Sequence, residues 1–245
     1  MNEKIDTYDN EFFKRILATS LPSANIIIPM AIELVKPKSV IDIGCGIGAF
    51  LSCFRENGIE DILGIDGDYV DLNNILIPRD KFSPYDLSKK YNVGRKFDLA
   101  VSLEVAEHIQ KESAEVFIDN LVNLSDVILF SAAIPGQGGT SHVNEQWPTY
   151  WAEIFKKRGY YPVDCLRKKI WDKPEVSWWY KQNIMFFVKE ECLNNYGFED
   201  QYIKKNFSQL SLVHPELWQL KANLAKSQSK MAARIKNFIK TLFGK

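Results

Sequence analysis

One glycine-rich turn constrains the fold of this chain more than any other stretch. A β-branched run that contains one acid, Val40–Ile43, is followed by glycines at positions 44, 46 and 48 and then by an apolar segment from Ala49. Glycine has no Cβ, so the backbone can approach a ligand closely and can adopt positive φ. This order of strand, turn and helix is typical of a nucleotide-binding α/β domain.

The apolar pattern alternates between strand-like and helix-like segments along most of the chain. Strands are predicted at Ser39–Ile43, Ile62–Asp66, Phe82–Asp86, Phe97–Glu104, Asp126–Ser131, Tyr161–Leu166 and Asn183–Val188. Helices are predicted at 7–35 (with Pro29 as a kink or a helix start), from Phe50 to just before Gly58, at Glu112–Leu124, at Trp147–Arg158, and from Pro215 onward. This alternation predicts a Rossmann-like, doubly wound sheet of seven mostly parallel strands with flanking helices.

Three parts are expected along the chain: an N-terminal helical lid or packing segment (1–37), a ligand-binding domain (38–191) and a helical C-terminal extension (192–245). With 245 residues, 46% of them hydrophobic and 25% charged, the chain can bury a full core. No run approaches roughly 18 consecutive apolar residues, and the start shows no signal-peptide pattern. We therefore expect a cytoplasmic protein.

The charge is zero overall but uneven along the chain. A formal net charge of zero gives no general reason to bind nucleic acid. From Lys221 to the end there are seven basic residues and no acid, so the residues before 221 carry a net −7. This basic tail either contacts the inner face of a membrane peripherally as an amphipathic helix, or packs on the domain or on a second copy of the chain in a homodimer.

The four cysteines do not form a metal-binding pattern. They are too scattered for the Cys-x-x-Cys spacing of a zinc site and have apolar neighbours: Cys45, Cys53, Cys165 and Cys192. We expect them to be reduced structural thiols, and we expect no metal site.

The residues around the glycine turn favour a cationic ligand over a pyrophosphate. A dinucleotide-binding turn has the form Gly-x-Gly-x-x-Gly, whereas here the third glycine comes one residue early and Asp42 precedes the turn. S-adenosylmethionine carries an ammonium and a sulfonium and no phosphate. Asp66, at the end of the second strand, can accept the ribose hydroxyls, and Asp86 with Leu87 can contact adenine. Each acid also has a plain interpretation as a turn or helix cap.

Four segments together resemble class I S-adenosylmethionine-dependent methyltransferases: Val40–Phe50, Gly64–Asp66, Asp86–Leu87 and Phe97–Ile109. The resemblance covers roughly residues 38–190 and implies S-adenosylmethionine as cofactor, with S-adenosylhomocysteine as product. It implies that the methionine end of the cofactor is contacted by Asp42, Gly44, Cys45 and Gly46, and that the ribose is contacted by Asp66 and Gly67. It also implies that Asp86 and Leu87 contact the adenine and that Leu103 and Glu104 face the reacting side of the cofactor.

Two histidines are candidates for the base that a hydroxyl acceptor would need as it attacks the methyl group. His108 follows the fourth strand, and it can equally be a helix-start residue bonded to backbone. His142 lies after a glycine-rich loop, close to Glu145, in the segment that shapes the acceptor pocket in the resembled family. His142 is the better base candidate, with His108 and Glu145 as further catalytic candidates, although a solvated loop is the plain alternative.

The aromatic residues give an indication of the chemical class of the methyl acceptor. Five of the six tryptophans fall within one third of the chain, and their rings suit the C–H faces of sugars as well as aromatic acceptors: Trp147, Trp151, Trp171, Trp178 and Trp179. The stretch from Gly138 to Pro148 resembles bacterial methyltransferases of glycan or secondary-metabolite synthesis, which implies a hydroxyl of a sugar or glycan precursor. The alternatives are an amine, carboxylate or secondary-metabolite acceptor, a non-catalytic cofactor-binding scaffold, or a nicotinamide-dependent oxidoreductase, which the early third glycine disfavours.

Overall fold

The computed structural model describes residues 10–243, with side chains placed for residues 17–232, 234 and 235. It divides the chain into two units, Met1–Leu212 and Val213–Lys245, each of which is described by itself. The expected start of the first helix at residue 7 lies outside the described residues.

The first unit is built on a seven-stranded sheet with the order β3-β2-β1-β4-β5-β7-β6. Its strands are β1 (Ser39–Ile43), β2 (Asp61–Asp66), β3 (Phe82–Pro84), β4 (Leu99–Leu103), β5 (Val127–Ser131), β6 (Tyr160–Val163) and β7 (Met185–Lys189). Every neighbouring pair from β3 to β5 is parallel, and β7 runs antiparallel to both β5 and β6. The predicted Rossmann-like sheet of seven mostly parallel strands is confirmed.

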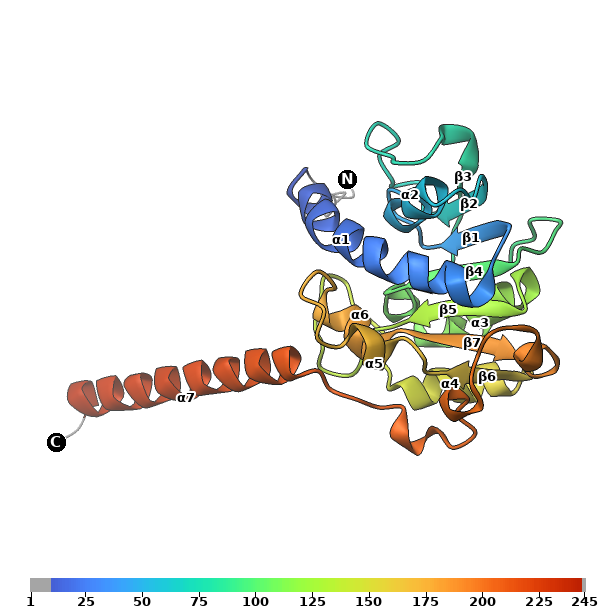
Figure 1. The fold of residues 1–245 in the computed structure, drawn as a ribbon. Coiled ribbons are helices and arrows are strands. Elements are labelled where there is room, and N and C mark those ends of the chain that lie inside the picture. Colours follow the sequence, from blue (N-terminus) through green and yellow to red (C-terminus); the bar gives the residue numbers. More distant parts are fainter. Residues whose placement is uncertain (1–9, 244–245) are drawn as a thin grey trace. The chain divides into compact units, whose positions relative to one another are not determined.

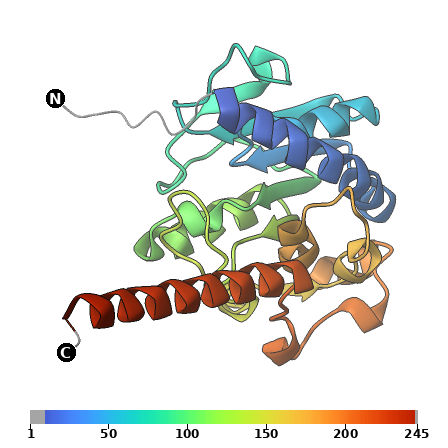
Figure 2. The same cartoon turned by 90° about the vertical axis from the view of Figure 1, so that its left-hand side faces the viewer.

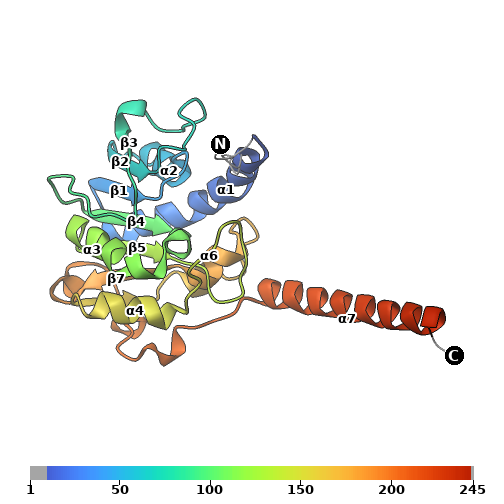
Figure 3. The same ribbon diagram turned by 180° about the vertical axis from the view of Figure 1, so that it is seen from behind.

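Helices cover both faces of the sheet (Figures 1 and 3). Helices α1 (Asn10–Val35) and α2 (Ala49–Glu56) lie on one face, together with the short α5 (Arg167–Ile170) and α6 (Trp178–Asn183); α3 (Ala114–Leu124) and α4 (Pro148–Lys156) lie on the other. Two hydrophobic clusters fill the two layers, and β1, β4 and β5 contribute side chains to both. Because both faces are apolar, the polar side chains that serve a ligand lie at the sheet's carboxyl edge, where the strand order reverses between β1 and β4.

Helix α1 is a core helix that continues through two prolines. Pro22 and Pro29 lie inside Asn10–Val35, so the expectation that Pro29 starts a helix is wrong. Leu17–Val35 has a mean hydropathy of 1.4 and passes the length and composition test for a membrane span, which the search for an unbroken apolar run did not predict. Its residues Ala24, Ile27, Ile28 and Ala31 are nevertheless completely buried in the layer shared with α2.

Residues 192–212 are part of the first unit rather than of a C-terminal extension. Asp164 N–H donates to Tyr202 O and Lys204 N–H donates to Pro162 O, both at 2.9 Å, so this segment binds along the edge of β6. The fully buried Arg167 guanidinium pairs with Asp164 and donates to Leu210 O at 2.7 Å. The described residues 10–212 therefore form one unit, in place of the expected boundaries after residues 37 and 191.

The second unit contains α7 (Pro215–Phe243), which begins at Pro215 as predicted. Near its start Leu217 is buried, at 4% exposure, whereas five apolar side chains further along are exposed: Trp218, Leu220, Leu224, Met231 and Ile235. Apart from Trp218, these exposed residues follow one another at intervals of four or seven positions, so they lie on one side of the helix. Phe238 and Leu242, which were expected to extend this apolar face, lie outside the described side chains.

If the basic tail contacts a membrane rather than a protein surface, it should bind anionic lipid, because each basic residue near such a surface contributes about 1 kcal/mol and the apolar face can enter the lipid boundary. In liposome flotation, the full chain should float with vesicles that contain phosphatidylserine, and a chain without residues 221–245 should stay at the bottom. Neutral phosphatidylcholine vesicles are the control for the charge contribution. Equal recovery of both chains would remove the membrane interpretation and leave packing on a protein surface.

Candidate active site

The glycine turn after β1 is shaped by packing on one side and by a cavity on the other. Gly44 has φ +84°, and a Cβ added there would clash with the Val105 side chain. A Cβ added at Gly46 would meet no atom within 4 Å. Gly46 N–H donates to Asp66 Oδ2 at 2.6 Å, which ties the turn to the end of β2. The turn therefore leaves its backbone open to a ligand at Gly46.

A cavity of about 1390 Å³ lies at the carboxyl edge of the sheet. Figure 2 looks onto this edge, with the yellow-green loop 132–147 over it. The cavity is lined by every predicted cofactor residue and by both candidate histidines: Asp42, Gly44, Cys45, Gly46, Asp66, Gly67, Asp86, Leu87, Leu103, Glu104, His108 and His142. The third catalytic candidate, Glu145, is not in the lining but contacts His142. The volume exceeds the roughly 300–1,000 Å³ of ordinary ligand pockets, so a cofactor and an acceptor can share it.

Two buried acids lie at the cofactor end of the cavity. Asp42 and Asp66 are 4% and 5% exposed. Burial raises the pKa of Asp42 well above its usual range, and the neighbouring Asp66 raises it further. Such a pair repels a phosphate and favours a positively charged group. The residues present therefore fit the ammonium and sulfonium of S-adenosylmethionine, as Asp42 alone predicted from the sequence.

Asp66 already accepts hydrogen bonds of the kind that a ribose would offer. Its Oδ1 accepts the Gly67 N–H at 2.6 Å and the Tyr69 hydroxyl at 2.5 Å. Tyr69 is half exposed and also lines the cavity. A ribose hydroxyl would take the place of the Tyr69 hydroxyl on the same oxygen. Tyr69 was not predicted, because no motif marks it.

Asp86 combines its place in the cavity lining with the capping role that was its plain interpretation. Its Oδ1 accepts from the Ser88 hydroxyl at 2.6 Å and from the Ser88 N–H at 3.1 Å, and its Oδ2 pairs with Lys89 at 3.0 Å. These bonds, the Ser88 hydroxyl first, lower the pKa of Asp86 to about 2. The adenine contact of Asp86 and of the buried Leu87 stays a prediction.

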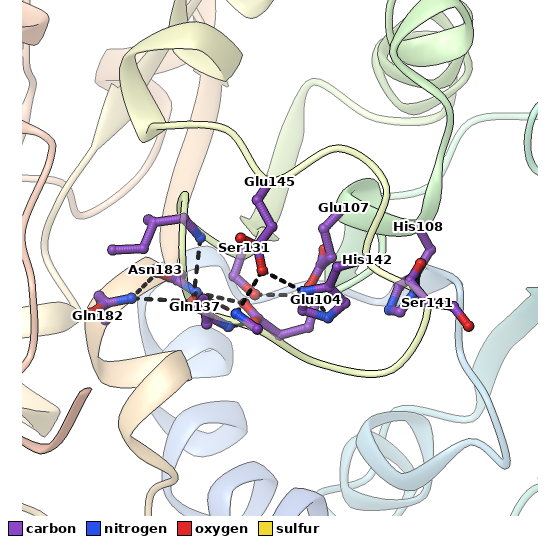
Figure 4. Close-up of polar contacts among 12 residues, drawn as sticks. Glu104, Glu107, His108, Ser131, Gln137, Ser141, His142, Glu145, Gln182 and Asn183 are labelled. Atoms are coloured by element: carbon purple, nitrogen blue, oxygen red, sulfur yellow. Dashed lines mark hydrogen bonds and ion pairs between the residues drawn. The ribbon is translucent and has the colours of Figure 1, made fainter. Parts of the chain in front are cut away.

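Glu104 is held by an amide network at the end of β4 (Figure 4). Its backbone has φ +56°, which is unusual for a residue with a side chain. Its carboxylate accepts from Gln137 Nε2 at 2.8 Å and from Asn183 Nδ2 at 3.0 Å. Burial raises the pKa of Glu104, and the hydrogen bonds from Asn183, Ser131 and Gln137 offset part of that rise. Gln137 comes from the loop after β5 and Asn183 from the end of α6, and neither stands in a motif, so the sequence did not reveal them.

His142 and Glu145 form an oriented pair. His142 Nδ1 lies 2.9 Å from Glu145 Oε1. The Glu145 carboxylate also accepts the Gly136 N–H at 2.7 Å and the Gly138 N–H at 2.6 Å. Burial raises the pKa of Glu145, but the bonds from His142 and these two glycines outweigh it and lower the pKa overall. The loop that was predicted to carry the base thus holds one imidazole in a fixed orientation.

His108 and Glu107 face His142 from the other side of this cluster (Figure 4). The His108 ring lies edge-on to the His142 ring at 4.9 Å, and its Nδ1 is 3.3 Å from Ser141 O. Desolvation and the neighbouring His142 lower the pKa of His108. Glu107 is completely buried, and its Oε1 lies 3.9 Å from His142 Nε2. Burial and then the nearby Glu104 raise the pKa of Glu107 well above its usual range. Glu107 stood in the recognised motif without an assigned role.

The tryptophans divide between cavity and core. Trp178 and Trp179 line the cavity and pack edge-on, with ring centroids 5.4 Å apart. Trp151 is a core residue at 1% exposure and so does not meet an acceptor. Trp147 and Trp171 are not in the cavity lining. Two of the five clustered tryptophans are therefore placed to meet an acceptor.

Comparison with known proteins agrees with this fold. Residues 24–126 match a family model described as a methyltransferase domain. None of the curated proteins compared with the chain matches it. Among solved structures, an O-methyltransferase family protein from Burkholderia thailandensis aligns with a TM-score of 0.54 and 11% identity over 73% of this chain. DesVI from Streptomyces venezuelae aligns with a TM-score of 0.55 and 12% identity, also over 73% of this chain and over 96% of its own.

The family match and the fold define the class of this domain. Over residues 24–126 the chain matches a methyltransferase domain, and its fold and cavity fit a class I enzyme with S-adenosylmethionine as cofactor. The chain spans only 58% of the length of the Burkholderia protein. The reaction and its acceptor are taken up below as proposals.

Replacing Asp66 with alanine should weaken S-adenosylmethionine binding at least tenfold, because hydrogen bonds to a charged group contribute about 1.5–3 kcal/mol each. Isothermal titration calorimetry measures the affinity. Tyr69→Phe is the matched control: it removes the competing phenol but keeps the carboxylate, so it should bind the cofactor equally well or more tightly. Because Asp66 also accepts the Gly46 N–H, the melting temperatures of both variants are compared. Unchanged affinity in a folded Asp66→Ala variant would contradict the ribose assignment.

Proposed function

We propose that this chain transfers a methyl group from S-adenosylmethionine to a hydroxyl of a sugar or glycan precursor. The observation that carries the proposal is that both imidazoles line the same cavity as the glycine turn and the two buried acids. A cofactor site and groups able to activate a hydroxyl thus share one space. The cavity volume leaves room for an acceptor beside the cofactor.

Methyl transfer to a hydroxyl requires that the acceptor oxygen is aligned with the methyl group and that the hydroxyl loses its proton. The bound cofactor would supply a methyl group activated by a positively charged sulfur. The acceptor oxygen forms a bond to the methyl carbon, the carbon–sulfur bond breaks with its electron pair staying on sulfur, and the hydroxyl proton must leave. Glu145 holds the Nδ1 side of His142 at 2.9 Å, so the Nε2 side is free to act toward the cavity.

The lining of the cavity supports a sugar as acceptor. Trp178 and Trp179 offer apolar ring faces with polar edges, which suit the C–H faces of a sugar. Gln137 and Ser141 lie in the same lining and offer hydrogen-bonding groups of the kind that bind hydroxyls. An amine or carboxylate acceptor would need little help from a base, so the imidazole cluster favours a hydroxyl over these alternatives.

Assays with isotope-labelled cofactor test the acceptor class. We expect labelled methyl to appear on a nucleotide sugar or on a surface-glycan extract when the chain is supplied with S-adenosylmethionine. Labelling of protein or nucleic acid alone would rule out the sugar proposal. Tight cofactor binding without any S-adenosylhomocysteine formation across these acceptors would favour the scaffold alternative.

The imidazole cluster is tested by His142→Ala, which should lower kcat about 100-fold or more, the range seen when a positioned proton-transfer group is lost. The KM for S-adenosylmethionine should change little, since His142 is not among the predicted cofactor contacts. Val143→Ala, a change to an exposed neighbour in the same loop, is the matched control and should keep kcat. A His142→Ala variant with the parent kcat would show that the cluster does not activate the acceptor.

A further inference from the structure

One carboxylate and two imidazoles converge at the carboxyl edge of the sheet. Glu107, His108 and His142 each place one possible metal-ligand atom within 4.8 Å of the other two. We propose that these three residues bind a divalent transition-metal cation next to the acceptor pocket. The sequence predicted no metal site, because that expectation considered only the spacing of the cysteines.

Both histidines present the arrangement that metal-binding histidines use. His108 Nδ1 lies 3.3 Å from Ser141 O, and a carbonyl oxygen can only accept, so Nδ1 carries the proton. His142 Nδ1 is turned to Glu145, whose carboxylate already accepts two backbone N–H groups and so also accepts here. In each ring Nε2 is left with its lone pair free. A metal-bound imidazole almost always donates its other ring N–H to a carboxylate or a backbone carbonyl.

Glu107 is an independent sign of a ligand. The residue is 0% exposed, and among the described residues no group meets its carboxylate oxygens in good hydrogen-bond geometry. The backbone N–H groups of Glu107 and Ala133 lower its pKa, but less than burial raises it. A buried polar side chain without a partner is costly, and a buried charge is normally paired or bound to a metal. The nearby Glu104, by contrast, receives hydrogen bonds from Gln137 and Asn183. The chain thus satisfies one acid of the motif and leaves the other aimed at His142.

The backbone holds the two ligand-bearing segments together. The N–H groups of Val143 and Asn144 both donate to the backbone carbonyl of Glu107 at 2.9 Å. The loop that carries His142 is therefore fixed on the turn that carries Glu107 and His108. His142 Nε2 and Glu107 Oε1 lie 3.9 Å apart, which fits two atoms that are each about 2.1 Å from one ion. His108 offers a third ligand atom within 4.8 Å of the other two.

The ligand set indicates the class of metal. Mg²⁺ and Ca²⁺ prefer oxygen ligands, whereas two imidazoles and one carboxylate suit Mn²⁺, Fe²⁺ or Zn²⁺ and leave positions open for a further ligand. With Nε2 of His142 bound to the cation, the cation would take over the role of the imidazole: it would stabilise the alkoxide of a bound acceptor hydroxyl, whose proton would leave to water. This role in the reaction rests on the proposed function, but the binding of the cation does not.

Metal binding is measured on the full chain without a polyhistidine tag, after treatment with a chelator and its removal. Mn²⁺ is added, and the electron paramagnetic resonance signal of free Mn²⁺ reports the bound fraction. We expect one site per chain, displaced by Zn²⁺. Glu107→Gln keeps the shape and removes the charge, and it should weaken Mn²⁺ binding at least tenfold, as should His142→Ala. Val143→Ala should bind as the parent does.

A thermal shift guards against misfolded variants. Mn²⁺ should raise the melting temperature of the parent chain but not that of Glu107→Gln, which should fold without metal because glutamine has nearly the shape of glutamate. Absence of Mn²⁺ binding in the parent, or equal affinity in Glu107→Gln, would overturn the proposal. Mn²⁺ binding without methyl transfer to any hydroxyl would support the metal site and overturn only the proposed function. Methyl transfer to a hydroxyl without Mn²⁺ or Zn²⁺ binding would support the proposed function and overturn only the metal site.

Discussion

The burial of both faces of the sheet is the constraint on which the site depends. Strands β1, β4 and β5 are covered by apolar helices on either side, so their polar residues gather where the strands end. Asp42, near the end of β1, Asp66 at the end of β2 and Glu104 just after β4 are brought to one edge in this way, although they are distant in sequence. Packing of the core and placement of the charges are thus consequences of the same layered arrangement.

Features with a local cause were predictable from the sequence. The strands follow from short apolar runs, and Gly44 follows from the positive φ and close packing that a tight turn after a strand requires. Asp42 and Asp66 could be placed at the cavity because the carboxyl ends of neighbouring parallel strands meet at one edge. His142 and Glu145 could be paired because they are three residues apart in one loop.

Features that depend on distant contacts were not predictable. The amides that hold Glu104 come from Gln137 and Asn183, 33 and 79 residues away. Residues 192–212 looked irregular by composition, yet their backbone pairs with the edge of β6 and with the buried Arg167. Nothing in the sequence around Glu107 says that its oxygens lack a partner, because that depends on the loop that carries His142 folding back onto it.

The distribution of hydrogen bonds among the acids separates structural from functional roles. Glu104 and Glu145 accept two or more hydrogen bonds each, so both act as fixed supports. Asp66 accepts one of its bonds from Tyr69, a half-exposed side chain that a ligand can replace. If Glu107 had a purely structural role, the amide network that satisfies Glu104 a few residues away would be expected to reach it as well. The network does not reach Glu107, whose carboxylate faces Nε2 of His142. A cation would bind between these two groups.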